Sequence, residues 1–148
     1  YRPPNNPWVD ALMLECQKFA IKSVITKGSG GPKKFLSLIK EKEHVLLLVD
    51  QKMGEGISVP FLGHEAMTAT GIAKMYLNQN CPIMPARSER LHDSKFRVTF
   101  YPPIDFTPQG NQKEDMYNLL LSINNMISEW VTERPGQWLW LHRRWKGA

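Results

Sequence analysis

Apolar residues recur every three or four positions in several stretches of the chain, which is the spacing of a helix with one buried side. The first such stretch follows Asn6-Pro7, a capping side chain and a proline suited to the first helical turn. The third would be capped by Thr68 or Thr70. The last carries the longest apolar stripe. The pattern predicts four helices, at about residues 7–19, 32–42, 70–78 and 114–132.

The extended segments are predicted from runs of apolar and β-branched residues. His44–Asp50 is continuously apolar in its middle, which is typical of a strand covered on both faces of a sheet. Ser23–Thr26 and Val59–Phe61 are shorter candidates. The intervening segment Gln51–Ser58 contains two glycines and is predicted to be a loop.

A β-hairpin is predicted where Pro82–Arg90 and Phe96–Tyr101 flank a polar turn. In the second strand Phe96, Val98 and Phe100 alternate with more polar residues, so we expect their face to be buried. Helices and strands alternate through most of the chain. This order predicts an α/β fold with a mixed sheet and helices on both faces, within one domain spanning residues 1–148.

Composition narrows the possible partners. The 148 residues carry a net charge of +5 and have a pI near 9.3, which favours anionic partners such as phospholipids. The longest apolar run, Val45–Val49, is far shorter than the roughly 20 residues of a membrane-spanning helix. Any membrane contact of this segment is therefore expected to be peripheral. Outside the C-terminal segment, basic residues are scattered rather than interleaved with aromatics, which disfavours nucleic acid.

No complete catalytic set can be assembled from the residues alone. Cys16 and Cys81 lack metal-ligand spacing and are expected to be free thiols in a reducing compartment. We therefore expect neither a metal nor a cofactor. His64 precedes a carboxylate, but adjacent side chains diverge and make a poor dyad. Asp50 ends the apolar strand, where α/β sheets often place functional groups, but it could equally form a cap or turn.

The final eleven residues, Trp138–Ala148, combine three tryptophans with four cationizable side chains. Indoles and cations suit the boundary between a bilayer and water, where lipid phosphates lie. The same composition also suits a terminal segment whose tryptophans cover the core. The residues leave both interpretations open.

Taken in order, several motifs resemble the lauroyl/myristoyl acyltransferases of bacterial lipid A biosynthesis. The resemblance covers essentially the whole chain, and its closing block is the longest and rarest piece. The matching segments are Tyr1-Arg2-Pro3, Asn6-Pro7, Val49-Asp50-Gln51, Val59–Gly63, Thr68–Gly71, Pro82–Pro85, Pro102-Pro103 and Pro135–Lys146.

The resemblance implies transfer of a fatty acyl group from acyl carrier protein, or acyl-CoA, to a hydroxyl of a lipid A precursor in lipopolysaccharide biosynthesis. It implies a fold similar to that of glycerolipid acyltransferases and a place on the cytoplasmic face of the bacterial inner membrane. Members of this family use a histidine general base with an acidic residue five positions later. No histidine here has that partner, because Val49, Ala69, Arg97 and Gly147 occupy the four positions.

The simplest expectation is that this chain is the C-terminal half of such an enzyme, incomplete at its N-terminus and inactive alone. The base and a membrane helix are expected upstream. By resemblance, Arg2 and Asp50 support the active site, and Arg2 holds a phosphate or the acyl-donor arm. His142, Arg143 and Arg144 either bind a headgroup or close the fold. The residues expected to bind substrate are Arg2, Pro60, Phe61, Gly63, Thr70, Gly71, His142, Arg143 and Arg144.

Two other functions remain open. A glycerol-phosphate-type acyltransferase shares the Pro82–Pro85 pattern, although the Trp138–Lys146 block argues against it. A non-catalytic module that binds anionic lipid through its basic residues would explain the net charge without requiring a base.

Overall fold

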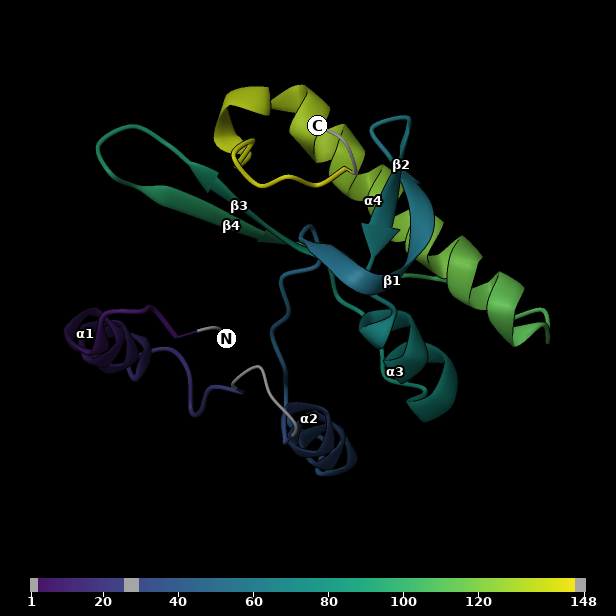
Figure 1. The fold of residues 1–148 in the computed structure, drawn as a ribbon, viewed down its shortest axis with the longest axis horizontal. Coiled ribbons are helices and arrows are strands. Elements are labelled where there is room, and N and C mark those ends of the chain that lie inside the picture. Colours follow the sequence, from purple (N-terminus) through teal and green to yellow (C-terminus); the bar gives the residue numbers. More distant parts are fainter. Residues whose placement is uncertain (1–2, 26–29, 146–148) are drawn as a thin grey trace. The chain divides into compact units, whose positions relative to one another are not determined.

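The computed structural model describes residues 3–25 and 30–145, and the chain divides into two compact units, Tyr1–Leu46 and Leu47–Ala148 (Figure 1). The first unit contains helices α1 (Pro7–Gln17) and α2 (Gly31–Lys40). Both helices were predicted, and the cap of α1 is confirmed. Asn6 Oδ1 accepts the backbone N–H of Trp8 at 2.9 Å, with Pro7 at the first helical position. The expected strand at 23–26 does not form over its described residues, 23–25.

The first strand of the second unit lies later in the chain than the apolar pattern predicted. His44–Val49 have no strand partner among the described residues. The expected loop at 51–58 instead belongs to β1 (Lys52–Phe61), which pairs antiparallel with β2 (His64–Thr68). The expected extended piece at 59–61 is the end of β1. The turn between the strands holds Leu62 and Gly63 at φ values of 50° and 77°.

Gly56 explains why a glycine-bearing segment is a strand here. The β1–β2 register shifts between Lys52 and Ile57, so both residues lie opposite Thr68. A Cβ on Gly56 would lie 2.0 Å from the Thr68 carbonyl oxygen. The close approach of two backbones at a bulge therefore requires a glycine at this position. From the sequence alone, such a glycine looks the same as one in a flexible loop.

The predicted hairpin forms from β3 (Ala86–Arg90) and β4 (Phe96–Phe100), but the prediction of its buried face was wrong. Phe96, Val98 and Phe100 are 56%, 55% and 68% exposed. The opposite face contacts the end of α4 instead. Arg87 forms an ion pair with Glu133 at 2.5 Å, and Glu89 forms one with Arg134 at 3.1 Å. The inward face of the hairpin therefore carries polar contacts to the helix end, and Arg87 also lies over the Trp130 ring.

The core of the second unit lies between the β1–β2 pair and two helices, α3 (Gly71–Gln79) and α4 (Gln112–Glu133) (Figure 1). Both helices were predicted. Asn111 caps α4, and buried Asp115 accepts the backbone N–H groups of Gln109 and Gly110 at 2.8 and 3.1 Å. The buried apolar residues are Val59, Phe61, Ala66, Ala73, Leu119, Leu120, Ile123, Ile127 and Val131.

The α/β class is confirmed, but the single mixed sheet is not present in the described residues, which form two separate antiparallel pairs. Each described strand pairs only with the next strand along the chain, β1 with β2 and β3 with β4, and such hairpin pairs are antiparallel. Across residues 3–25 and 30–145, no helix has the length and apolar character needed to span a bilayer.

Candidate functional site

The C-terminal block, defined here as residues 138–145, folds back from the end of α4 toward β2, as the yellow end of the chain shows in Figure 1. Trp138 and Trp145 pack on Phe61, with ring centroids 5.5 and 5.9 Å apart. Trp145 Nε1 also donates to the Phe61 carbonyl at 3.2 Å. Two of the three tryptophans of the terminal segment therefore contact the core through the end of β1.

Arg144 is the most deeply buried residue of this block, with no exposed surface. Its guanidinium donates to the Met67 carbonyl at 2.6 Å and to Thr68 Oγ1 at 2.9 Å, and it lies 5.0 Å from the centre of the Phe61 ring. Burial lowers the pKa of Arg144, and the charge of Asp50 opposes that shift. Of the two roles that the sequence left open for Arg144, this geometry supports closure of the fold.

Thr68 connects Arg144 to α4. Its hydroxyl donates to the Ala66 carbonyl and accepts from Asn124 Nδ2 at 3.1 Å as well as from Arg144. A hydroxyl offers one donor and two acceptor positions, so this one is fully used. The same Asn124 amide donates to the Pro60 carbonyl at 3.0 Å. Neither Thr68 nor Asn124 was predicted to belong to this cluster, although Asn124 interrupts an otherwise apolar stripe on α4.

His142 and Asp50 connect the same block to the start of β1. His142 Nε2 accepts the backbone N–H of Lys52 at 2.8 Å. Asp50 Oδ2 accepts Trp138 Nε1 at 3.1 Å. The structure thus brings Asp50, Phe61, His142 and Arg144 into one cluster around the tryptophans.

The other predicted site residues lie elsewhere. Gly63 is in the β1–β2 turn, and Thr70 precedes α3 at the cap position without a side-chain capping bond. Gly71 begins α3 with an exposed backbone, and Arg143 is exposed. The Pro60 carbonyl accepts a hydrogen bond from Asn124 of the cluster. Arg2 lies outside the described residues.

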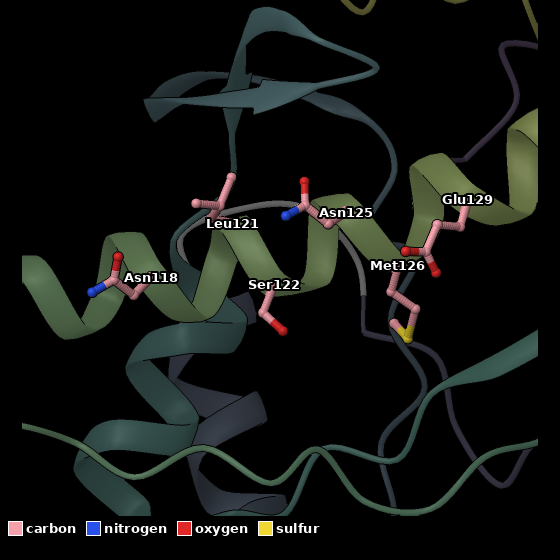
Figure 2. A pocket seen from close by; sticks show the side chains of 6 residues that line it. All are labelled: Asn118, Leu121, Ser122, Asn125, Met126 and Glu129. Carbon is pink, nitrogen blue, oxygen red and sulfur yellow. The ribbon is translucent and has the colours of Figure 1, made fainter.

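A shallow depression on α4 was a further candidate for a site. Figure 2 shows that its six lining residues all come from successive turns of this one helix. One helix face gives no converging groups, and the lining contains one carboxylate, Glu129. The residues that line it are Asn118, Leu121, Ser122, Asn125, Met126 and Glu129.

The neighbouring residues His64 and Glu65 do not contact each other as a dyad. Exposed His64 presents its ring edge-on to Trp145, and Glu65 bonds to Ser58 at 2.5 Å across the strand pair rather than to the histidine. Within residues 3–25 and 30–145, no three His, Cys, Asp or Glu side chains gather to form a metal site.

Comparison with known proteins assigns the chain over nearly its whole length. The family model described as bacterial lipid A biosynthesis acyltransferase matches residues 1–147. The chain is 26% identical over 150 residues to a lipid A biosynthesis lauroyltransferase of Escherichia coli (strain K12), covering 99% of this chain and 47% of that protein. It is 26% identical over 145 residues to a lipid A biosynthesis acyltransferase of Haemophilus influenzae, covering 95% of this chain and 43% of that protein. The chain spans about half the length of these curated relatives.

Proposed function

The chain belongs to the bacterial lipid A biosynthesis acyltransferase family, and we propose that it forms the C-terminal portion of one acyltransferase domain. In this proposal the complete protein transfers a fatty acyl group from acyl carrier protein, or acyl-CoA, to a hydroxyl of a lipid A precursor. The observation that carries the proposal is the family match over residues 1–147, which includes the C-terminal block.

We propose that the general base lies outside this chain. In the proposed reaction a histidine with an acidic partner removes the proton from the acceptor hydroxyl, whose oxygen attacks the thioester carbonyl. The C–S bond then breaks, and the leaving sulfur receives that proton from the histidine. No histidine of this sequence has an acidic residue at the required spacing. In this proposal the chain contributes a scaffold and substrate contacts. We also propose that the complete protein has a membrane helix upstream of this chain and works at the bacterial inner membrane.

The contacts of the C-terminal block support two roles among its residues. Asp50, His142 and Arg144 fix the block to the strands, because each is hydrogen-bonded within the second unit. Exposed Arg143 is free of such contacts among the described residues and is the residue of the block best placed for an anionic headgroup. Arg2 is proposed to hold a phosphate or the acyl-donor arm.

The test compares the 148-residue chain with the full-length protein from the same gene, using an acyl carrier protein thioester and a lipid A precursor. We expect transfer by the full-length protein and none by the chain alone, because the chain lacks the base. Transfer by the chain that is abolished in His64→Ala would contradict the missing base. Transfer only to glycerol 3-phosphate would favour the glycerol-phosphate alternative, and lipid binding without transfer by either protein would favour a non-catalytic module.

A further inference from the structure

A basic depression lies between the β3–β4 hairpin and the chain that follows α4. Its volume is about 460 Å³, within the roughly 300–1,000 Å³ that is typical of small-molecule sites. The depression in Figure 2 is lined by a single helix, whereas this one is lined by both strands of the hairpin, their turn and the segment after α4. The lining residues are Arg90, Leu91, His92, Arg97, Arg134 and Gln137.

The strand register places Arg97 on the side of the hairpin that meets the end of α4. Arg97 lies directly opposite Glu89, and residues opposite each other share a face. Glu89 pairs with Arg134, so this face is the one turned toward the helix end. Arg90 lies opposite Phe96 on the other face, with its guanidinium carbon 5.2 Å from the centre of that ring. The arginine side chains available to the depression are therefore those of Arg97 and Arg134.

The carboxylates of this face are already engaged by other cations. Glu133 pairs with Arg87, and Glu89 Oε1 lies 3.1 Å from Arg134 Nε and 3.8 Å from an Arg87 nitrogen. Arg97 has no carboxylate within ion-pair distance among residues 3–25 and 30–145. Arg134 uses its Nε on Glu89, which leaves its two terminal nitrogens as donors for a further acceptor. Three arginines thus share two glutamates, and the unmatched positive charge is at Arg97.

Gln137 fixes the hairpin to the segment that follows α4. Its side chain accepts the N–H of Arg90 at 2.9 Å and donates to the Arg90 carbonyl at 3.1 Å. Gln137 ends the 3₁₀ turn η1 (Pro135–Gln137), which begins directly after Arg134. The Glu89 ion pair and the Gln137 bonds therefore position the backbone around the depression before any ligand binds. Such preorganisation lowers the ordering cost of binding.

Two guanidinium groups at one depression suit an oxyanion that has several acceptor oxygens. A phosphomonoester carries a charge of about −1.5 to −2 at pH 7 and offers three acceptor oxygens, so it can accept from both groups at once. The turn of the hairpin also contains Asp93 and Lys95, both exposed, whose charges offset each other at pH 7. The charge that the depression offers to an anion is therefore that of its arginines.

We propose that this depression binds a phosphomonoester group through Arg97 and Arg134. The group belongs to a soluble molecule or to a lipid headgroup, and the experiment separates these two sources. Gln137 holds the site together and does not contact the anion with its side chain, because both ends of its amide are bonded to Arg90. The inference concerns anion binding and does not depend on acyl transfer by the same protein.

The experiment measures binding of inorganic phosphate by equilibrium dialysis, at constant ionic strength with chloride as the replaced anion. It uses the full-length protein from the same gene and, beside it, the 148-residue chain. We expect saturable binding to both, and Arg97→Gln should weaken it about tenfold, because a hydrogen-bonded charge is lost. The matched control Arg90→Gln removes the same charge from the other face of the same hairpin and should weaken binding about twofold or less.

Three results would overturn the site. Equal weakening by Arg97→Gln and Arg90→Gln would mean that net charge, and not the depression, attracts the anion. Phosphate binding by the chain but not by the full-length protein would mean that the rest of the protein fills the depression. The third result is an absence of saturable phosphate binding to either protein.

Vesicles of phosphatidylcholine with and without phosphatidic acid identify the source of the phosphate. If Arg97→Gln weakens binding to the phosphatidic acid vesicles as much as it weakens phosphate binding, the site is supported with a lipid headgroup as its ligand. If only phosphate binding responds, the site is supported with a soluble ligand. A glutamate-rich peptide that binds more tightly than phosphate, with the same dependence on Arg97, would overturn the choice of ligand.

Folding of each variant is checked by circular dichroism and thermal unfolding. Arg134→Gln should also weaken phosphate binding, but it removes the partner of Glu89 and can lower stability. Arg97→Gln changes an exposed residue that has no ion pair among the described residues, so it decides the question if Arg134→Gln does not fold. Arg97→Lys should recover only part of the lost binding, because an ammonium lacks the planar fork. Unchanged binding by folded Arg97→Gln would overturn the proposal.

Discussion

Thr68 and Arg144 are joined by a buried hydrogen bond of 2.9 Å that connects the C-terminal block to β2. The threonine hydroxyl also accepts from Asn124 and donates to Ala66, so strand, helix and terminal block share one oxygen. Arg144 has no exposed surface and Thr68 is 3% exposed. A buried guanidinium without acceptors would be strongly unfavourable, and Thr68 is one of the two that Arg144 uses, beside the Met67 carbonyl.

Thr68→Val tests this dependence with little change of volume. We expect the free energy of unfolding to fall by roughly 2–3 kcal/mol, because donors from Arg144 and Asn124 lose a buried acceptor. Urea unfolding of the 148-residue chain measures the change. Thr68→Ser, which keeps the hydroxyl, should cost about 1 kcal/mol for the lost methyl group. Equal stability of the valine and wild-type proteins would mean that Arg144 finds other acceptors.

Gly56→Ala tests the close approach of β1 to Thr68. The added Cβ would lie 2.0 Å from a backbone oxygen, which has no flexible side chain to move aside. We expect a loss of roughly 3 kcal/mol in thermal or urea unfolding, at the upper end of overpacking effects. Gly54→Ala is the matched control, because a Cβ there meets nothing within 4 Å and should change stability by about 0.5 kcal/mol or less. The same loss in both variants would contradict a steric cause.

Asp50→Asn separates charge from hydrogen bonding. The amide oxygen can still accept Trp138 Nε1, but the negative charge that raises the pKa of Arg144 is removed. We expect a loss of about 1 kcal/mol in unfolding free energy, and about 1 kcal/mol more for Asp50→Ala, which also removes the acceptor. In the full-length protein, acyl transfer that falls far more than stability would assign Asp50 to the active site as well.

Arg2 is tested in the full-length protein. Arg2→Ala should lower acyl transfer strongly, and Arg2→Lys should recover only part of it, because a planar fork binds an anion through two bonds and an ammonium acts as a point charge. Steady-state assays with the acyl carrier protein thioester give the comparison. Equal rates for lysine and arginine would mean that this position supplies charge alone or packs against its neighbours.

Arg143 and Arg144 should behave differently although they are adjacent. Arg143→Gln should leave thermal stability unchanged and weaken binding to anionic vesicles by about fivefold at low salt, because Arg143 is exposed. Arg144→Gln should unfold at a lower temperature, because its contacts are internal. Raised salt should reproduce the effect of the Arg143 change on vesicle binding. Equal effects of the two substitutions on stability would contradict the buried placement of Arg144.

The sequence determined the helices correctly because helical signals are local. Asn6 caps α1 as predicted, and the apolar stripe on α4 is readable within a single segment, although its cap, Asn111, was not predicted. The β3–β4 hairpin was also predictable, since its two strands are separated by a short polar turn. The family was predictable because its motifs are read in order along the chain.

The site was predictable only in part. Asp50, Phe61, His142 and Arg144 were all selected from the sequence, and the structure joins them in one cluster. Thr68 and Asn124 were missed as partners, because a threonine at a strand end and an asparagine on a helix have many ordinary roles. The headgroup and active-site roles of the predicted residues stay predictions.

Tertiary structure alone decided strand pairing and the direction of each face. Apolar content favoured a strand at 44–50, yet the strand that pairs with β2 is at 52–61. There Gly56 allows the backbone of Thr68 to come close. Alternation in β4 indicated two faces but not which one turns inward, and in the folded chain the face with Arg87 and Glu89 meets Glu133 and Arg134 at the end of α4. Arg144 is buried because its acceptors, 76 and 77 residues earlier in the chain, lie beside it once the chain folds. A helix carries its own hydrogen bonds within a few residues, whereas a strand or a buried cation needs partners that the linear sequence does not place.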